Sequence, residues 1–250
     1  MACWCCRRFE RRWRNAWGGK WLLRLSTGFW PAMAGERWRR IRVIPTAIRK
    51  FKKLGKKLPE DLASLLTADA VGTRRVRIMF QDEARFGRMV RIRRCWSPAP
   101  SRPMVDNGYE RKFTYVYGAV SPMQGELDWM ISPKMNTEQM NQFLLQVSLA
   151  HPEEFIVMIV DGASSHRSQD LRVPGNIRLH RLPGYSPQLN PQEHVWDELR
   201  EKEFPNRVFE SMAAVVGQLE EGLPRMAANT QALRSLTAWP WIVSLILKAQ

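Results

Sequence analysis

Cysteine and histidine are scarce in this chain, with four of each among 250 residues. Three of the cysteines, Cys3, Cys5 and Cys6, fall within the first six residues, and Cys95 stands alone. No histidine lies near the cluster and no second cysteine pair completes a tetrahedral ligand set, so a structural zinc site is not expected. Nothing in the cysteine spacing indicates a disulfide framework, and the expected compartment is the reducing cytoplasm.

Long apolar runs are also missing, and acidic residues are nearly absent from the beginning of the chain. No stretch approaches the roughly 18 uninterrupted apolar residues of a membrane span, so no membrane partner is expected. Residues 1–57 hold 17 Lys and Arg against 2 Asp and Glu, a net charge of 17 − 2 = +15. The remaining residues hold 22 of each sign and are neutral. The basic character therefore belongs to the N-terminal segment and carries no information about the rest of the chain.

The first 47 residues have an unusual composition and no regular pattern. Six of the 11 Trp and ten Arg lie within residues 1–45, and neither a 3.6-residue nor a 2-residue period is sustained. We interpret residues 1–47 as an irregular Arg/Trp-rich segment, either translated out of frame or the ragged end of a truncated gene. Stacking of its Trp and Arg on bases is the functional alternative. Residues 48–69 differ, because apolar residues at helical spacing predict a basic helical lead-in.

Residues 70–250 show the alternation of strands and helices that is typical of an α/β domain. Clean two-residue alternation over residues 75–82 predicts a first strand. A helix is predicted to begin after Asn136, with Gln139 at capping-box spacing, and another begins near Pro191. Further strands are predicted over residues 89–96, 113–120, 126–131, 155–160 and 177–182, and further helices over residues 208–222 and 226–248. This order predicts a mixed sheet with helices packed on its faces.

Three carboxylates occupy positions that suit a metal site. Asp82 and Asp161 each end a hydrophobic strand face, and Glu193 lies just inside a helix start. An ionised carboxylate at the end of a buried face is costly unless a cation or donor meets it. Three such oxygen ligands suit Mg²⁺ or Mn²⁺, and two ions about 3.5–4 Å apart can promote phosphoryl displacement. Taken singly, each residue has an ordinary explanation as a turn former or a first-turn helix acid.

Three motifs together resemble those of a known family. They are Gln-Asp-Glu at 81–83, Asp-Gly-Ala-Ser-Ser-His at 161–166 and Leu-Pro-Gly-Tyr-Ser-Pro-Gln-Leu-Asn-Pro-Gln-Glu at 182–193. The set resembles the DDE transposases, specifically the bacterial insertion-sequence relatives of the mariner elements. The third motif, continued by Val195 to Arg200, is highly specific, whereas the first is weak alone. The resemblance covers about residues 48–245.

The resemblance implies a ribonuclease H-like fold and metal-dependent cleavage and strand transfer in DNA transposition. By position, Asp82, Asp161 and Glu193 match the family's metal-binding catalytic triad, which would take Mg²⁺ or Mn²⁺, two ions in all. His166, Tyr185 and Asn190 match residues that line or shape that site and are expected to support it. The expected partners are element-end DNA and target DNA, with a homodimer in the DNA complex.

Two departures from the family pattern keep alternatives open. The 31 residues between Asp161 and Glu193 (193 − 161 − 1) are slightly fewer than mariner relatives usually have. Residues 1–57 also lack the helix-turn-helix pattern that recognises element ends. The alternatives are an inactive or truncated relic that binds DNA without catalysis and a ribonuclease H-like nuclease with another substrate. Arginines between positions 74 and 94 indicate either phosphate contacts or the exposed residues of an edge strand.

Overall fold

The computed structural model describes residues 72–88, 100, 104, 111–161, 170–182, 189–206 and 208–249. All of them belong to one unit of the chain, Val43–Gln250. The predicted Arg/Trp-rich segment, the basic lead-in and the strand over residues 89–96 lie outside the described residues. Their boundaries stay predictions.

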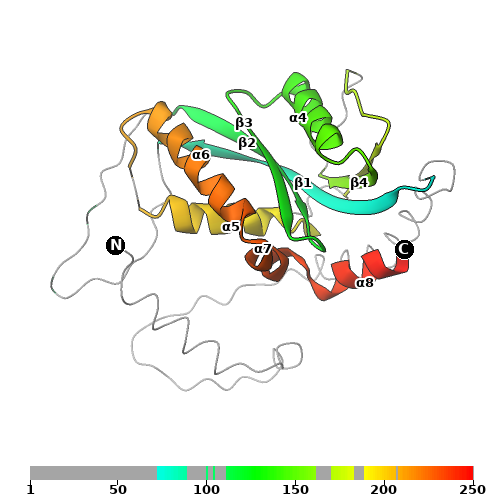
Figure 1. Cartoon of the computed structure of the whole chain (residues 1–250). Coiled ribbons are helices and arrows are strands. Elements are labelled where there is room, and N and C mark those ends of the chain that lie inside the picture. The colour runs from blue at the N-terminus through cyan, green and yellow to red at the C-terminus, as the bar shows by residue number, and fades with distance from the viewer. Residues whose placement is uncertain are drawn as a thin grey trace, which may run out of the picture. The chain divides into compact units, whose positions relative to one another are not determined.

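Five strands form one mixed sheet in the order β3-β2-β1-β4-β5 (Figure 1). The long strand β1 is antiparallel to β2 and parallel to β4. At the two edges, β3 is antiparallel to β2, and β5 is parallel to β4. The strands are β1 Arg75–Gly87, β2 Phe113–Ser121, β3 Glu126–Ser132, β4 Glu154–Val160 and β5 Ile177–Arg181. The predicted mixed α/β sheet is confirmed.

Strand β1 is longer and more central than its sequence pattern indicated. It continues from Asp82 to Gly87, because β2 supplies pairing partners as far as Phe113, opposite Gly87. In the sheet order β1 is an interior strand, but residues 75–79 pair with β4 and residues 81–87 pair with β2, and Arg75 and Arg85 are exposed. Arg77 is buried and donates to Glu154 and Glu126, so it is not available for phosphate contacts.

One helix, α4 Thr137–Ala150, covers one face of the sheet. Asn136 caps it as predicted, with its side-chain oxygen accepting from the Gln139 backbone N–H at 2.9 Å. The Gln139 side chain does not complete a reciprocal capping box, because its oxygen instead accepts from the Ser132 hydroxyl. The buried residues of α4 are Met140, Phe143, Leu144 and Val147, which share one face at helical spacing.

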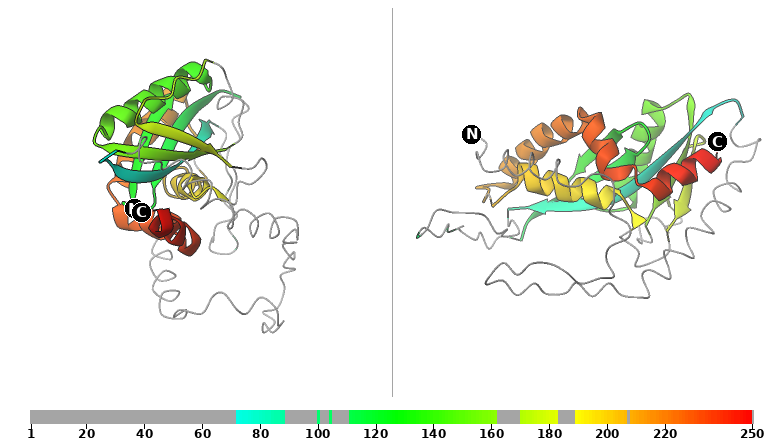
Figure 2. Two further views of the ribbon diagram at one scale, coloured as in Figure 1. Left: turned by 90° about the vertical axis from the view of Figure 1, so that its right-hand side faces the viewer. Right: turned by 90° about the horizontal axis from the view of Figure 1, so that it is seen from below.

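Four helices follow in sequence and pack with the other face: α5 Gln192–Glu203, α6 Met212–Ala227, α7 Thr230–Thr237 and α8 Pro240–Ala249 (Figure 2). The helical stretch predicted over residues 226–248 is two helices. Asn229 caps α7, and the chain breaks again before Pro240 because a proline disfavours helical geometry in the residue preceding it. Helix α6 begins after the Ser211 cap and continues through Pro224.

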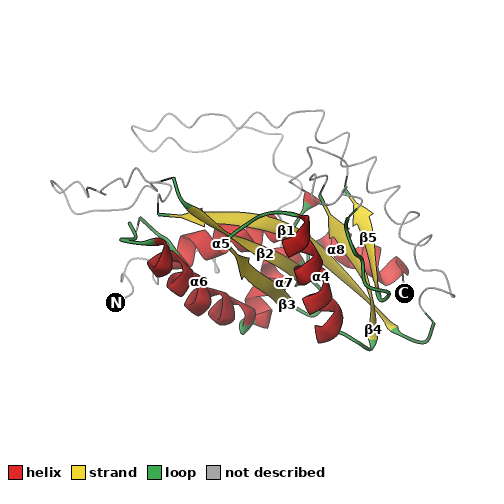
Figure 3. Ribbon diagram, turned by 90° about the horizontal axis from the view of Figure 1, so that it is seen from above, coloured by secondary structure: helices red, strands yellow, loops and turns green. Residues whose placement is uncertain are grey.

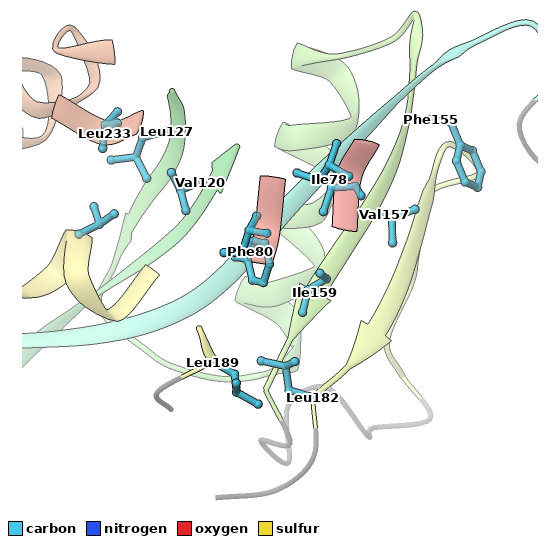
Figure 4. Close-up of a cluster of buried hydrophobic side chains, with 13 residues drawn as sticks. Ile78, Phe80, Val120, Leu127, Phe155, Val157, Ile159, Leu182, Leu189 and Leu233 are labelled. Atoms are coloured by element: carbon cyan, nitrogen blue, oxygen red, sulfur yellow. The ribbon is translucent and has the colours of Figure 1, made fainter. Parts of the chain in front are cut away.

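The core on the α5–α8 side lies next to the candidate carboxylates on β1 and just after β4. Ile78 and Phe80 of β1 pack with Val157 and Ile159 of β4, and Leu189 closes the cluster beside them (Figure 4). Burying each of these side chains contributes roughly 1.5–3 kcal/mol. Within the described residues, no helix combines the length and apolar character needed to cross a membrane.

Candidate metal-binding active site

The two candidate aspartates come from neighbouring parallel strands at the same edge of the sheet. The register pairs Ile78 with Val157 and Phe80 with Ile159. Two residues further along each strand lie Asp82 and Asp161, so strand periodicity places both on the face of those apolar pairs. Asp82 is only 9% exposed, whereas Asp161 is half-buried. The sheet register therefore brings together two of the three predicted carboxylates.

Helix α5 brings Glu193 to the same place, and Asn190 holds the helix start against β1. The Asn190 side-chain N–H donates to the Gln81 carbonyl oxygen at 2.9 Å. Its side-chain oxygen accepts from the Gln192 backbone N–H at 3.1 Å. Asn190 therefore links the residue before Asp82 to the residue before Glu193. This contact gives a physical role to the Asn190 that the sequence indicated as a supporting residue.

Trp196 contacts Asp82 directly, which the sequence motifs did not indicate. Its indole Nε1–H donates to Asp82 Oδ2 at 3.1 Å, and the Trp196 side chain is fully buried. Gly118, opposite Asp82 in β2, leaves the space for that ring. A Cβ at Gly118 would lie 2.4 Å from Trp196 Cη2 and 2.7 Å from Gln192 Nε2. No sequence pattern within α5 or β2 alone reveals this contact.

The site has an excess of negative charge around a buried acid. Burial raises the pKa of Asp82 well above its usual value, and the charges of Glu193, Glu83 and Asp161 raise it further. A hydrogen bond from the Glu83 backbone opposes this shift only in part. The side-chain amide of Gln192, next to Gly118, is also buried without a hydrogen-bond partner. A cation bound beside Asp82 would offset both the repulsion among the carboxylates and the cost of burying a charged Asp82.

The donor set matches a hard divalent cation in its chemistry. Carboxylate oxygens are the ligands that Mg²⁺ and Mn²⁺ prefer. Among the described residues, however, no three His, Cys, Asp or Glu side chains lie close enough to hold one ion. Asp161 and Glu193 thus lie near enough to influence Asp82, but the three side chains are not arranged as a complete ligand set for one ion. The other two predicted supporting residues, His166 and Tyr185, lie outside the described residues.

A neutral residue in place of Asp82 is expected to stabilise the metal-free protein. Because its folded-state pKa is raised, Asp82 favours folding most below its unfolded pKa of about 3.9, and this contribution is lost as pH rises towards the folded value. Asp82→Asn keeps an oxygen that can accept from Trp196. We expect it to raise the free energy of unfolding at pH 7 by about 1–3 kcal/mol. Denaturant unfolding in EDTA between pH 5 and pH 8 measures this.

A control residue separates this effect from general removal of negative charge. Glu153 is exposed and lies just before β4, at the opposite end of the sheet. Glu153→Gln is expected to change the free energy of unfolding by less than about 0.5 kcal/mol. A less stable Asp82→Asn variant at pH 7 would contradict the charge repulsion described above.

A mixed sheet that carries acidic residues just beyond the parallel pairing of two neighbouring strands, with a third on a packed helix, is typical of the ribonuclease H-like class. Within that class the family is clear: residues 77–215, more than half of the chain, match the DDE superfamily endonuclease family. The chain belongs to this family. An uncharacterized protein (y4pE/y4sA) of Sinorhizobium fredii (strain NBRC 101917 / NGR234) is 35% identical over 105 residues, which are 42% of this chain and 78% of that protein.

Solved structures of the Mos1 mariner transposase share the fold at low sequence identity. A pre-cleavage Mos1 transpososome superposes with a TM-score of 0.56 at 14% identity, over 98% of this chain and 71% of that one. The Mos1 strand transfer complex gives 0.53 at 16% identity, over 96% and 69%. A Mos1 paired-end complex with Mn gives 0.53 at 15% identity, over 98% and 71%. These comparisons confirm the ribonuclease H-like fold.

Proposed function

We propose that this chain is the catalytic part of an insertion-sequence transposase, which cleaves DNA strands and joins them to a target. The observation that carries the proposal is the family match, supported by the influence of Asp161 and Glu193 on the pKa of Asp82. Asp82 and Asp161 extend one face of two paired strands, and Glu193 lies near enough to raise the pKa of Asp82. The family match supports a phosphodiester as the substrate.

In this proposal Asp82, Asp161 and Glu193 hold divalent ions, Mg²⁺ or Mn²⁺. Such ions activate the attacking oxygen and stabilise the leaving oxygen of a phosphodiester. Trp196 keeps one Asp82 oxygen engaged, and Asn190 fixes the start of α5 so that Glu193 stays beside the strand ends. A water attacks the phosphodiester at an element end, and the freed 3′-hydroxyl then attacks target DNA in the same site.

The Mos1 structures also suggest the partners. These structures are a strand transfer complex and a paired-end complex with Mn. By analogy, we propose that this chain acts as a homodimer on two element ends, in the bacterial cytoplasm. The second candidate function is a relic that binds DNA without cleaving it. It is favoured by one observation, that the described carboxylates do not form a closed three-ligand group.

Cleavage of the DNA that flanks the gene distinguishes the two candidates. The full chain is incubated with a supercoiled plasmid that carries the genomic DNA on both sides of the gene, with Mg²⁺, Mn²⁺ or EDTA. The transposase proposal predicts nicks that map to the ends of flanking inverted repeats and that disappear in EDTA. Binding of this plasmid without any nicking in either metal would instead support the relic.

A further inference from the structure

A second surface on the β1–β2 hairpin has the composition of a nucleic-acid contact. It consists of Arg85 of β1 and Phe113 and Tyr115 of β2, which we call the hairpin surface. Arg85 pairs with Tyr115 in the strand register, and Phe113 pairs with Gly87. Strand periodicity places all three side chains on the face that α4 covers further along the sheet. They therefore lie on the opposite face from Asp82.

The hairpin surface is exposed because α4 covers β2 only as far as Tyr117. Tyr117, two residues along from Tyr115, packs on Phe143 of α4 and its hydroxyl accepts from the Asn136 backbone N–H. Beyond it, β1 and β2 run on past α4 (Figure 3). Phe113 is 36% exposed and Arg85 is exposed, whereas Tyr115 is half-buried. An aromatic ring at such a site contributes little to the core.

The exposed side chains are arranged as a flat cationic platform. The Arg85 guanidinium lies over the Phe113 ring, 5.0 Å from its centroid. Exposed Arg111 and Lys112 immediately precede Phe113, and exposed Lys134 follows the β3 residue that pairs with Tyr115. Among the described residues, the acids nearest in sequence or register are Glu83, two residues before Arg85, and Glu138 in the first turn of α4. Within this described part, the four cations outnumber the two acids around the exposed Phe113 ring.

We propose that the hairpin surface binds single-stranded DNA. This inference rests on the proposed function, which supplies the DNA. Unpaired bases stack on aromatic and guanidinium planes, while neighbouring cations contact phosphates, and both kinds of group are present here. Arg85 lies three residues beyond Asp82, or roughly 10 Å along the strand. The platform is thus offset from Asp82 along β1 and lies on the opposite face of the sheet.

Binding of two DNA forms tests this assignment without any catalysis. Fluorescence anisotropy in EDTA compares the full chain on a labelled blunt duplex and on the same duplex with a 3′ single-stranded overhang. Phe113→Ala is expected to weaken binding of the overhang DNA roughly tenfold, through lost stacking, and blunt binding by less than about twofold. Arg85→Gln is expected to weaken both and to lower the salt dependence by about one phosphate contact.

The chain offers a matched control for each substitution. Arg75 is exposed on the same face of β1, ten residues from Arg85 and at the far end of the strand. Leu149 is an exposed apolar residue on α4, at 70%. Arg75→Gln and Leu149→Ala are expected to leave both affinities within about twofold, because neither residue belongs to the platform. Thermal melting of all four variants identifies any loss of folding.

Three results would overturn the proposal, and they separate it from the proposed function. If Phe113→Ala keeps the overhang preference while the unsubstituted chain binds and cleaves DNA, only the hairpin surface is wrong. If sedimentation shows that Phe113→Ala changes self-association of the chain without DNA, the surface is a protein interface instead. If the unsubstituted chain binds neither DNA form, both the hairpin surface and the transposase proposal fail.

Discussion

The Asp161→Asn variant is expected to lose metal-dependent DNA cleavage by on the order of a thousandfold or more. A ligand carboxylate supports several kcal/mol of transition-state charge stabilisation, and each 1.36 kcal/mol is a factor of ten in rate. Asp161 directly follows strand β4, and its charge contributes to raising the pKa of Asp82. Substitution with Asn preserves the shape of the side chain but removes its charge. The measurement is the initial nicking rate on the flanking-DNA plasmid in Mg²⁺, alongside Mn²⁺ titration calorimetry.

The control comes from the same strand. Glu153 immediately precedes β4 and is exposed, so Glu153→Gln removes an equal charge at the opposite edge of the sheet. It is expected to retain the cleavage rate and Mn²⁺ affinity of the unsubstituted chain. The Asp161→Asn variant should melt at or above the unsubstituted temperature in EDTA, because it removes repulsion from Asp82. Cleavage at an undiminished rate would remove Asp161 from the site.

Local periodicity was sufficient to predict the strands that build this site. The alternation of Ile78 and Phe80, continued by Asp82, gave the buried face correctly, because side-chain direction in a strand depends only on parity. The run before Asp161 was apolar on both faces, which is typical of a strand inside a sheet, and β4 does lie between β1 and β5. Asp161 could therefore be placed at a strand end from sequence alone, whereas the prediction that Asp82 ends its strand is wrong, because β1 continues to Gly87.

Contacts between distant segments were not predictable in the same way. Trp196 donates to Asp82 across 114 positions, and Asn190 reaches the Gln81 carbonyl across 109. Arg77 was interpreted as a surface cation, yet it pairs with Glu126 and Glu154 once the sheet order brings them together. Single-segment patterns report which face a residue occupies. They do not report which residue of another element it meets.

Gly118→Ala is expected to disrupt the candidate site from β2, where Gly118 pairs with Asp82. The new Cβ would lie 2.4 Å from Trp196 Cη2, so the fully buried ring has to shift, and its hydrogen bond to Asp82 Oδ2 is at risk. Overpacking together with the lost hydrogen bond is expected to cost roughly 2–4 kcal/mol of unfolding free energy. Mn²⁺ affinity should fall as well, because Asp82 loses its orienting partner. Denaturant unfolding and Mn²⁺ titration measure the two effects.

A second glycine gives the matched control for this substitution. Gly217 lies within α6, and a Cβ there meets nothing within 4 Å. Gly217→Ala is expected to stabilise the chain by about 0.5–1 kcal/mol through helix propensity, without changing Mn²⁺ affinity. If Gly118→Ala is as harmless as Gly217→Ala, the close packing of Trp196 on β2 is not what orients Asp82.

Trp196→Phe separates the packing of the ring from its hydrogen bond. Phenylalanine lacks both the indole N–H and the outer ring atoms that approach Gly118, so in the Gly118→Ala background it should relieve the overlap. The double variant is therefore expected to recover part of the lost unfolding free energy, because the two residues are in contact and their effects are not additive. Its Mn²⁺ affinity should stay low, since no donor then reaches Asp82 Oδ2. Recovery of both quantities together would mean that Trp196 serves the fold alone.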